Sequence, residues 1–452
     1  MLCEIYRYVR ARREYQALKK KKELYNKIIC INYIHIMGNE YISVVPSNVS
    51  SGQPVGYSSG TPILQFKIGA QDAFLKGNTV RLNGTFTKVG TNKDDAQWEP
   101  SLGIYNILEQ LVISSDKTTQ TIEHIENYNR FLASYIPATS SENDLLGHLN
   151  TSSMTTFSEL QCLEYTSSVD FSIALPCGVL LGSNPIPLSN QWGLKGLNIT
   201  LTLAPDSNVF FTTVDGKTAA DTTYQLSDLT LTAELSNPAP EQLSKLNSQS
   251  SNSFDYNSIS SHFAVINNGY ATINKNFGIK RCLSVFANFV TSSNINTYDK
   301  NGMSTMNIRQ RDDSNADITE VIFTRNGQRY PLDYDLISVQ RDYPGTTSGD
   351  GQILRNYLNA LKPFSKLDRT TMNVFNGTNL KSCNKLHDQP PNVYGVGIAY
   401  DTISGQGVSL YDVPFSMIIK STLNTDNPTS CFIYAHSKET IVMNKDGIQV
   451  LR

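Results

Sequence analysis

Short segments in which apolar and polar residues alternate, separated by turn residues, recur from Thr61 to the end of the chain. In the clearest of them Val80, Leu82, Gly84 and Phe86 alternate with polar neighbours. A period of two places one face of a strand in a core and the other in water, while Gly, Pro and Asn between segments supply the turns. This pattern restricts the chain to an all-β fold of packed antiparallel sheets.

The strands divide into two series. We predict strands at residues 63–68, 79–89, 107–113, 169–175, 198–203, 209–213 and 226–235, and then at 263–266, 280–290, 318–325, 395–400, 415–423, 431–437 and 440–443. The chain has 452 residues, whereas single cores stop growing at roughly 250 to 300 residues. A Ser-, Gln- and Asn-rich linker at 236–253 divides it. We therefore predict a basic N-terminal extension at 1–45, a first domain at 46–240 and a second domain at 241–452.

Each half has one predicted helix between its strands. Ile122, Ile125, Tyr128, Leu132 and Tyr135 recur at helical spacing and predict a helix at 122–135, which leaves Glu123, His124 and Glu126 on its outer side. A similar apolar stripe predicts a second helix at 352–361. The Gly- and Pro-containing loops at 343–351 and 388–392 are long, and such loops are either functional or simple surface loops.

The N-terminal extension is basic. Residues 1–36 contain nine Lys or Arg and three Glu, a net +6, whereas the rest of the chain carries −8. Such an arm could contact nucleic acid or an anionic membrane through phosphates, without reading sequence. Alternatively, Met37-Gly38-Asn39-Glu40 is the true start, and the first 36 residues are not part of the mature protein.

The cysteines argue for reduced thiols in an intracellular setting. They are odd in number, far apart and without a CxxC pair: Cys3, Cys30, Cys162, Cys177, Cys282, Cys383 and Cys431. The sequence contains no signal-peptide core and no apolar stretch of roughly 18 residues. Five sequons, at Asn48, Asn83, Asn150, Asn198 and Asn376, mean little without secretion.

No residue pattern predicts chemistry. The six histidines are isolated from one another: His35, His124, His148, His262, His387 and His436. Asp333-Tyr334-Asp335 lacks the glycine of a cation loop, and Asp312-Asp313 fits a solvated loop. Paired carboxylates of a glycosidase leave no sequence signature, so Glu109, Glu123, Glu126 and Glu164 can be nominated without preference. We predict no catalytic, cofactor-binding or metal-binding residue and no cofactor.

Several stretches together resemble one family. They are GIYNILEQLVISS at 103–115 with IEHIENYNRFLASY at 122–135, IPLS at 186–189 with GLNITLTLAP at 196–205, FTRNGQRYPLDY at 323–334 with Asn326-Gly327 as a two-residue hairpin turn, and GIAYD, STL, CFIYAHS and GIQV between 397 and 450. In their residues and in their order along the chain, these stretches are similar to double jelly-roll major capsid proteins of polinton-like viruses, virophages and Polinton elements. Residues 1–36 lie outside the resemblance.

The resemblance implies two tandem antiparallel eight-stranded jelly rolls with short helices in the inter-strand loops. It implies a homotrimeric, pseudo-hexameric capsomer that tiles an icosahedral virus shell, with penton and minor capsid proteins as further partners. The protein would then be no enzyme, would take no small-molecule substrate, and would be found in the virion capsid after assembly in the host cytoplasm or nucleus. The alternative is a secreted or surface β-sandwich that binds or hydrolyses carbohydrate, which the sequons favour and the cysteines and missing signal peptide oppose.

Overall fold

The computed structural model describes residues 39–50, 52–58, 60–98, 102–139, 149–150, 168–182, 184–212, 216–267, 269–303, 318–329, 336–337, 357, 359–361, 395–400, 407–421 and 428–452. The predicted loops at 343–351 and 388–392, the basic segment 1–36, Glu164 and Asp312-Asp313 lie outside these residues. Of the predicted helix at 352–361, Tyr357 and residues 359–361 are described and are helical.

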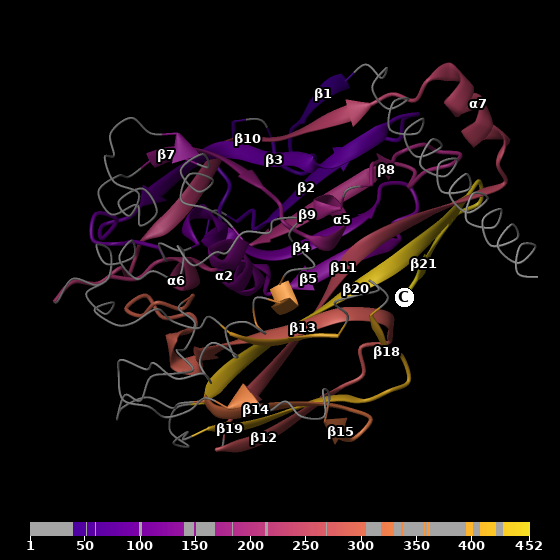
Figure 1. Ribbon diagram of the computed structural model, residues 1–452. Helices are drawn as coiled ribbons and strands as arrows, with labels where there is room; N and C mark the ends of the chain where they lie inside the picture. Colours follow the sequence, from indigo (N-terminus) through magenta and orange to yellow (C-terminus); the bar gives the residue numbers. More distant parts are fainter. Residues whose placement is uncertain are drawn as a thin grey trace, which may run out of the picture.

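The described residues form three sheets (Figure 1). In spatial order, the first contains β1 (Asn39–Val44), β10 (Thr223–Ser236), β3 (Phe74–Val89), β7 (Ser168–Ala174) and β6 (Leu149–Asn150), with β8 (Ile186–Pro187) beside β3. The second contains β2 (Ile63–Ile68), β9 (Leu197–Leu203), β4 (Leu108–Ser115), β5 (Thr121–Glu126), β11 (Ser251–Ile266), β20 (Thr429–Asn444), β13 (Ile279–Thr291) and β17 (Val396–Ala399), with β21 (Ile448–Leu451) beside β20 and β18 (Val408–Leu410) beside β13. The third contains β12 (Tyr270–Lys275), β19 (Phe415–Ser421), β14 (Ile318–Arg325) and β15 (Gln328–Arg329), with β16 (Leu336–Ile337) beside β14.

The same strand order occurs twice along the chain. In residues 39–236, β1, β10, β3 and β7 form one sheet and β2, β9, β4 and β5 the other; in residues 251–451, β11, β20, β13 and β17 correspond to the first set, and β12, β19 and β14 with β15 and β16 to the second. We call these two sets of strands the first and second lobes. All strand pairs in the described residues lie within one lobe, except for a single parallel bridge between His124 of β5 and Ser260 of β11.

Short helices connect some of the strands. They are η2 (Gly103–Ile107), α2 (Tyr128–Thr139), α5 (Gly178–Leu181), α6 (Asp206–Val209), α7 (Pro240–Ser248) and η3 (Ser292–Asn294). The chain passes from the first lobe to the second through α7, which buries none of its side chains. None of the helices in the described ranges is long and apolar enough to cross a membrane.

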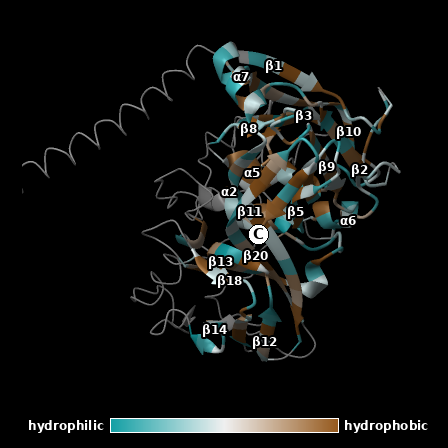
Figure 2. Cartoon of the chain, turned by 90° about the vertical axis from the view of Figure 1, so that its right-hand side faces the viewer, coloured by the Kyte–Doolittle hydropathy of each residue, from teal (hydrophilic) through white to brown (hydrophobic). Residues whose placement is uncertain are grey.

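The hydrophobic core is not divided between the lobes as the strands are. One cluster fills the first lobe and extends into the second, where it includes Phe254, Phe286 and Tyr434. A second cluster lies inside the second lobe and contains Val285 and Phe289. Strand β13 contributes successive side chains to both clusters, because neighbouring residues of a strand point to opposite faces. Hydrophobic segments accordingly occur on strands of both lobes (Figure 2), and one cluster contains residues from the two.

Several predicted strands agree with the structure. β2 and β14 have the predicted bounds, and the hairpin turn is confirmed, because Asn326 and Gly327 join β14 to β15 with φ angles of 52° and 75°. The strand predicted at 209–213 is wrong: α6 extends to Val209, and of the described residues after it only Phe211 makes an isolated bridge, to Gln97. The two strands predicted at 431–437 and 440–443 are one continuous strand, β20.

The helix predicted at 122–135 is wrong in its first part. β5 occupies Thr121–Glu126 and pairs with β4, Asn127 turns the chain with a φ of 53°, and α2 begins at Tyr128. Ile122 and Ile125 are both buried, so their three-residue spacing imitated a helical stripe. A strand can bury both of its faces where it is covered on both sides, and then the period of two disappears.

Candidate functional site

The three nominated carboxylates that the structure describes have separate surroundings and do not form a catalytic pair. Glu109 lies in β4, where its Oε2 accepts a hydrogen bond of 3.0 Å from Asn129 Nδ2. Glu126 is exposed. Glu123 was predicted to face outward, which is wrong: its side chain is 1% exposed. The only one of the three that is fully buried therefore lies at the junction between the lobes, not in a cleft.

Glu123 joins three segments of backbone. Its carboxylate accepts hydrogen bonds from the N–H groups of Gly178 (3.0 Å) and Val179 (2.9 Å) at the start of α5, and from the N–H of Ile259 in β11 (2.8 Å). Burial raises the pKa of Glu123 to about 7, although the three N–H donors act in the opposite direction. A buried carboxylate with three backbone donors is typical of a structural link, because its lone pairs are already taken.

Tyr256 makes a second link close to the first. Its hydroxyl lies 2.9 Å from Ile122 O in the first lobe and 2.8 Å from Glu439 Oε2 in β20. A phenol has one proton and can donate to one of these oxygens only. Burial raises the pKa of Glu439, although its contacts with Tyr256, Arg452 and Ser437 act in the opposite direction. The Tyr256 hydroxyl therefore lies between an acceptor of each lobe.

Helix α2 of the first lobe is bonded to the sheet of the second. Asn288 of β13 donates through Nδ2 to Arg130 O and to Ser134 Oγ, both at 2.7 Å. The hydroxyl of Tyr434 in β20 donates to Asn127 O at 2.8 Å. These bonds bring side-chain donors of the second lobe to the first turn of α2, where Asn127 O also accepts from the N–H groups of Arg130 and Phe131.

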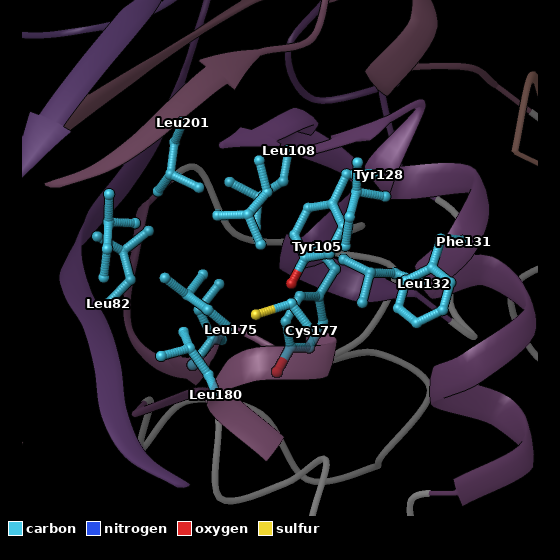
Figure 3. Close-up of a cluster of buried hydrophobic side chains, with 14 of the residues drawn as sticks. Leu82, Tyr105, Leu108, Tyr128, Phe131, Leu132, Leu175, Cys177, Leu180 and Leu201 are labelled. Atoms are coloured by element: carbon cyan, nitrogen blue, oxygen red, sulfur yellow. The ribbon is translucent and has the colours of Figure 1, made fainter. Parts of the chain in front are cut away.

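Aromatic rings fill the space between α2 and that sheet. The Phe131 ring lies 6.0 Å from Phe286 and 5.5 Å from Tyr434, and the Arg130 guanidinium lies 5.3 Å above the Phe432 ring. Burial lowers the pKa of Arg130 to about 10. The other side of α2 packs into the first lobe, where Tyr128 and Leu132 join Tyr105, Leu108 and Cys177 in one cluster (Figure 3).

A further link lies near the C-terminus. Lys195, at the turn before β9, donates through Nζ to Asn190 O at 2.8 Å and to Lys445 O at 2.9 Å, in the turn between β20 and β21. The polar links and the shared aromatic cluster together span the junction from α5 to α2. Such an interface differs from the small, polar contacts that let domains move relative to each other.

The histidines are scattered in the structure as in the sequence. His124 is exposed and lies 2.6 Å from Gln110 Nε2, His262 is half-buried, and His436 is fully buried in β20. Within the described ranges no three His, Cys, Asp or Glu side chains come close enough to hold a metal ion. His35, His148, His387 and Asp333-Tyr334-Asp335 lie outside those ranges.

The junction residues of β11 were missed because this strand begins within the predicted linker. Residues 251–258 read SNSFDYNS, a polar run typical of a connection. Phe254 and Tyr256 alternate within it and are both buried, which was the available signal for a strand.

Comparisons with known proteins identify the fold. No family model matches the sequence, and no curated protein matches it. PBCV-1 VP54, fitted into a cryo-EM reconstruction of the virophage Sputnik, superposes with a TM-score of 0.56 at 11% identity, covering 92% of this chain and 96% of that chain. The Sputnik virophage structure gives a TM-score of 0.51 at 13% identity over 91% and 88% of the two chains. The Faustovirus major capsid protein gives 0.50 at 10% identity over 89% and 90%.

The repeated strand order and these superpositions agree. The chain has a double jelly-roll fold. The predicted fold class is thereby confirmed, and the resemblance found in the sequence is confirmed at the level of fold. Each lobe is one jelly roll, and the junction described above joins the two lobes.

Proposed function

We propose that this protein is a major capsid protein that forms trimers of pseudo-hexameric outline and tiles an icosahedral virus shell. The observation that carries this proposal is the superposition of about nine-tenths of the chain on virus capsid structures, including a protein whose name is Faustovirus major capsid protein. Because the identities are 10% to 13%, the sequence itself adds only the family-like stretches described above.

The junction supports a role as a rigid building unit. Phe131, Phe286 and Tyr434 belong to one cluster that spans both lobes, so a change of angle between the lobes would expose that cluster to water. A tile needs a fixed shape, because small angular errors accumulate over a closed shell. Three chains with two similar lobes each would offer six near-equivalent sides to their neighbours.

The protein would act without chemistry of its own. Its partners would be two further copies within the trimer, neighbouring trimers, and penton and minor capsid proteins. The basic segment 1–36, if it is part of the mature chain, would contact nucleic acid or a membrane surface through phosphates. The protein would be found in the virion capsid, after assembly in the host cytoplasm or nucleus.

Two chains, one starting at Met1 and one at Met37, would be expressed and analysed by native mass spectrometry and electron microscopy. We expect a species of about three times the 50.2 kDa chain for the Met1 protein, and particles or ordered arrays at higher concentration. A protein that stays monomeric and is absent from particles in the producing cells would overturn the proposal.

A further inference from the structure

Exposed large apolar side chains gather at the same place in each lobe. Of the nine such side chains in the described residues, seven lie on the first strand, on the second strand or between them. In the first lobe these are Tyr41, Val45, Tyr57 and Ile63, and in the second lobe Phe263, Val265 and Tyr270. Apolar side chains exposed in a group on one edge are typical of contact surfaces.

The most exposed of them lie on or directly after β1. Tyr41 is 80% exposed and Val45 is 66% exposed, whereas Ile42 and Val44 pack against the core on the opposite face. One edge of β1 pairs with β10, and no other described strand lies beside its second edge. An unpaired strand edge that carries apolar side chains can pair with a strand of another chain.

The neighbouring edge strand, β2, is closed by contrast. Asn48 donates through Nδ2 to Ile63 O at 2.7 Å, and its Oδ1 accepts from Gln65 N at 2.9 Å. Ser47 N donates to Gln65 O at 2.7 Å. These local bonds occupy the edge of β2, so the open position on this side of the first lobe is β1.

The second lobe shows what covers the corresponding strand. By strand order β11 is the counterpart of β1, and its outer edge meets β5 of the first lobe. There His124 of β5 bridges Ser260, and Glu126 N donates to Ser261 Oγ at 3.0 Å. Within one chain, β5, the last strand in the second sheet of the first lobe, therefore lies beside β11, the first strand of the second lobe.

We propose that the outer edge of β1, with Tyr41 and Val45, docks a second copy of this chain through the edge of its second lobe formed by β15 and β16. These two short strands pair with β14 as β5 pairs with β4, so they are the counterpart of β5. The contact repeats between copies the junction that β5 and β11 make within a copy. It rests on the proposed function, and it adds which surfaces meet in the trimer.

The contact joins different surfaces of the two copies. Such a head-to-tail interface closes into a ring when its rotation divides the circle, and otherwise gives an open filament. When the contact between copies has the geometry of the junction within a copy, lobes follow one another at equal steps, and the proposed trimer is then a ring of six lobes. Tyr41 is well suited to the contact, because tyrosine buries a large apolar ring and keeps a polar group for the rim.

The first experiment removes the apolar side chains from the β1 edge. The double variant Tyr41→Asp/Val45→Asp is compared with Tyr411→Asp, which replaces an aromatic residue that is also exposed but lies outside the β1 edge. Native mass spectrometry over a concentration series gives the trimer dissociation constant. We expect the double variant to weaken trimer formation at least about tenfold, since truncating central apolar contacts commonly has effects of this size. The control is expected to remain trimeric.

The second experiment asks which surfaces meet. Chains carrying Ser43→Cys are mixed with chains carrying Gln328→Cys and oxidised, so that any disulfide between the two new cysteines joins two copies. Both replaced side chains are exposed, and the described cysteines Cys177, Cys282 and Cys431 are buried. We expect a cross-linked species identified by peptide mapping, and none above background when Ser43→Cys is mixed with Tyr411→Cys.

The outcomes separate this inference from the proposed function. A wild-type trimer with an unaffected double variant and no Ser43→Cys to Gln328→Cys cross-link would overturn the docking surface while leaving the capsid role in place. Peptide mapping that shows Ser43→Cys linked instead to residues 1–38 of its own chain would assign the β1 edge to that segment and would also overturn it. A monomeric wild type that is absent from particles would overturn both.

Discussion

The buried carboxylate of Glu123 makes the stability of the junction depend on pH. Its pKa is raised from 4.5 to about 7 by burial. Between these two values the folded protein holds a proton that the unfolded chain has released, so the contribution of Glu123 to stability is present below about pH 4.5 and is lost as the pH rises to about 7. From about pH 5 to about pH 8 the expected loss is roughly 2.5 kcal/mol, because one unit of pKa difference corresponds to about 1.4 kcal/mol.

The wild-type pH dependence alone would not isolate this effect. The raised pKa of Glu439 acts in the same direction. Burial lowers the pKa of His436 to about 3, so its contribution is present above the ordinary histidine range and is lost as the pH falls, which opposes Glu123. Glu439 and His436 are present in both wild type and Glu123→Gln. Their contributions therefore cancel when the free energies of unfolding of the two proteins are subtracted.

The assay is urea-induced unfolding of wild type and Glu123→Gln at about pH 5 and about pH 8, below the concentration at which trimers form. Glutamine keeps one acceptor oxygen and cannot ionise, so it destabilises the protein at both pH values. We expect the free energy of unfolding of wild type to exceed that of Glu123→Gln by roughly 2.5 kcal/mol more at about pH 5 than at about pH 8. The same substitution at Glu126, whose side chain is exposed, is the control and should change the free energy of unfolding by no more than about 0.5 kcal/mol. An equal effect of Glu123→Gln at the two pH values would refute the reasoning.

Two further substitutions test the junction by other means. Asn288→Ala removes both side-chain hydrogen bonds to α2, and we expect it to lower the free energy of unfolding by about 2 kcal/mol in urea unfolding, because buried acceptors lose their donor. Gly178→Ala places a Cβ 2.3 Å from Asn257 O in β11, so we expect the separation of α5 from β11 and a marked rise in proteolysis between the lobes. Gly182→Ala is the matched control, because its Cβ would lie 3.4 Å from the nearest atom, and it should be as resistant to proteolysis as wild type.

The sequence was sufficient for strands with one buried face and insufficient for the junction. β2 and β14 alternate regularly and are bounded by turn residues, so their ends could be predicted. β5 buries Ile122 from one face and Glu123 and Ile125 from the other, and β11 begins in a Ser- and Asn-rich run whose buried residues contact the other lobe. Which strand covers which is decided by contacts far apart in the chain, and local periodicity holds no information about them.

Glu123 shows the same limit at a single position. In the sequence it is an acidic residue between two isoleucines, and solvent exposure was the ordinary interpretation. Its burial depends on N–H donors 55 and 136 residues away. The capsid-like stretches, in contrast, predicted the double jelly roll, because they compare whole segments and not single contacts.

The shared face of α2 also has a consequence for the order of events during synthesis. α2 ends at Thr139, whereas β20, which supplies Phe432 and Tyr434, ends at Asn444. At roughly 5 to 20 residues per second, the ribosome needs between about 15 and 60 seconds to make the intervening chain. During that time the aromatic face of α2 lacks the cover that Phe432 and Tyr434 provide. Synthesis of β20 is therefore the event that completes the cover of this face, and a chain released before it would carry the face partly uncovered to other incomplete chains.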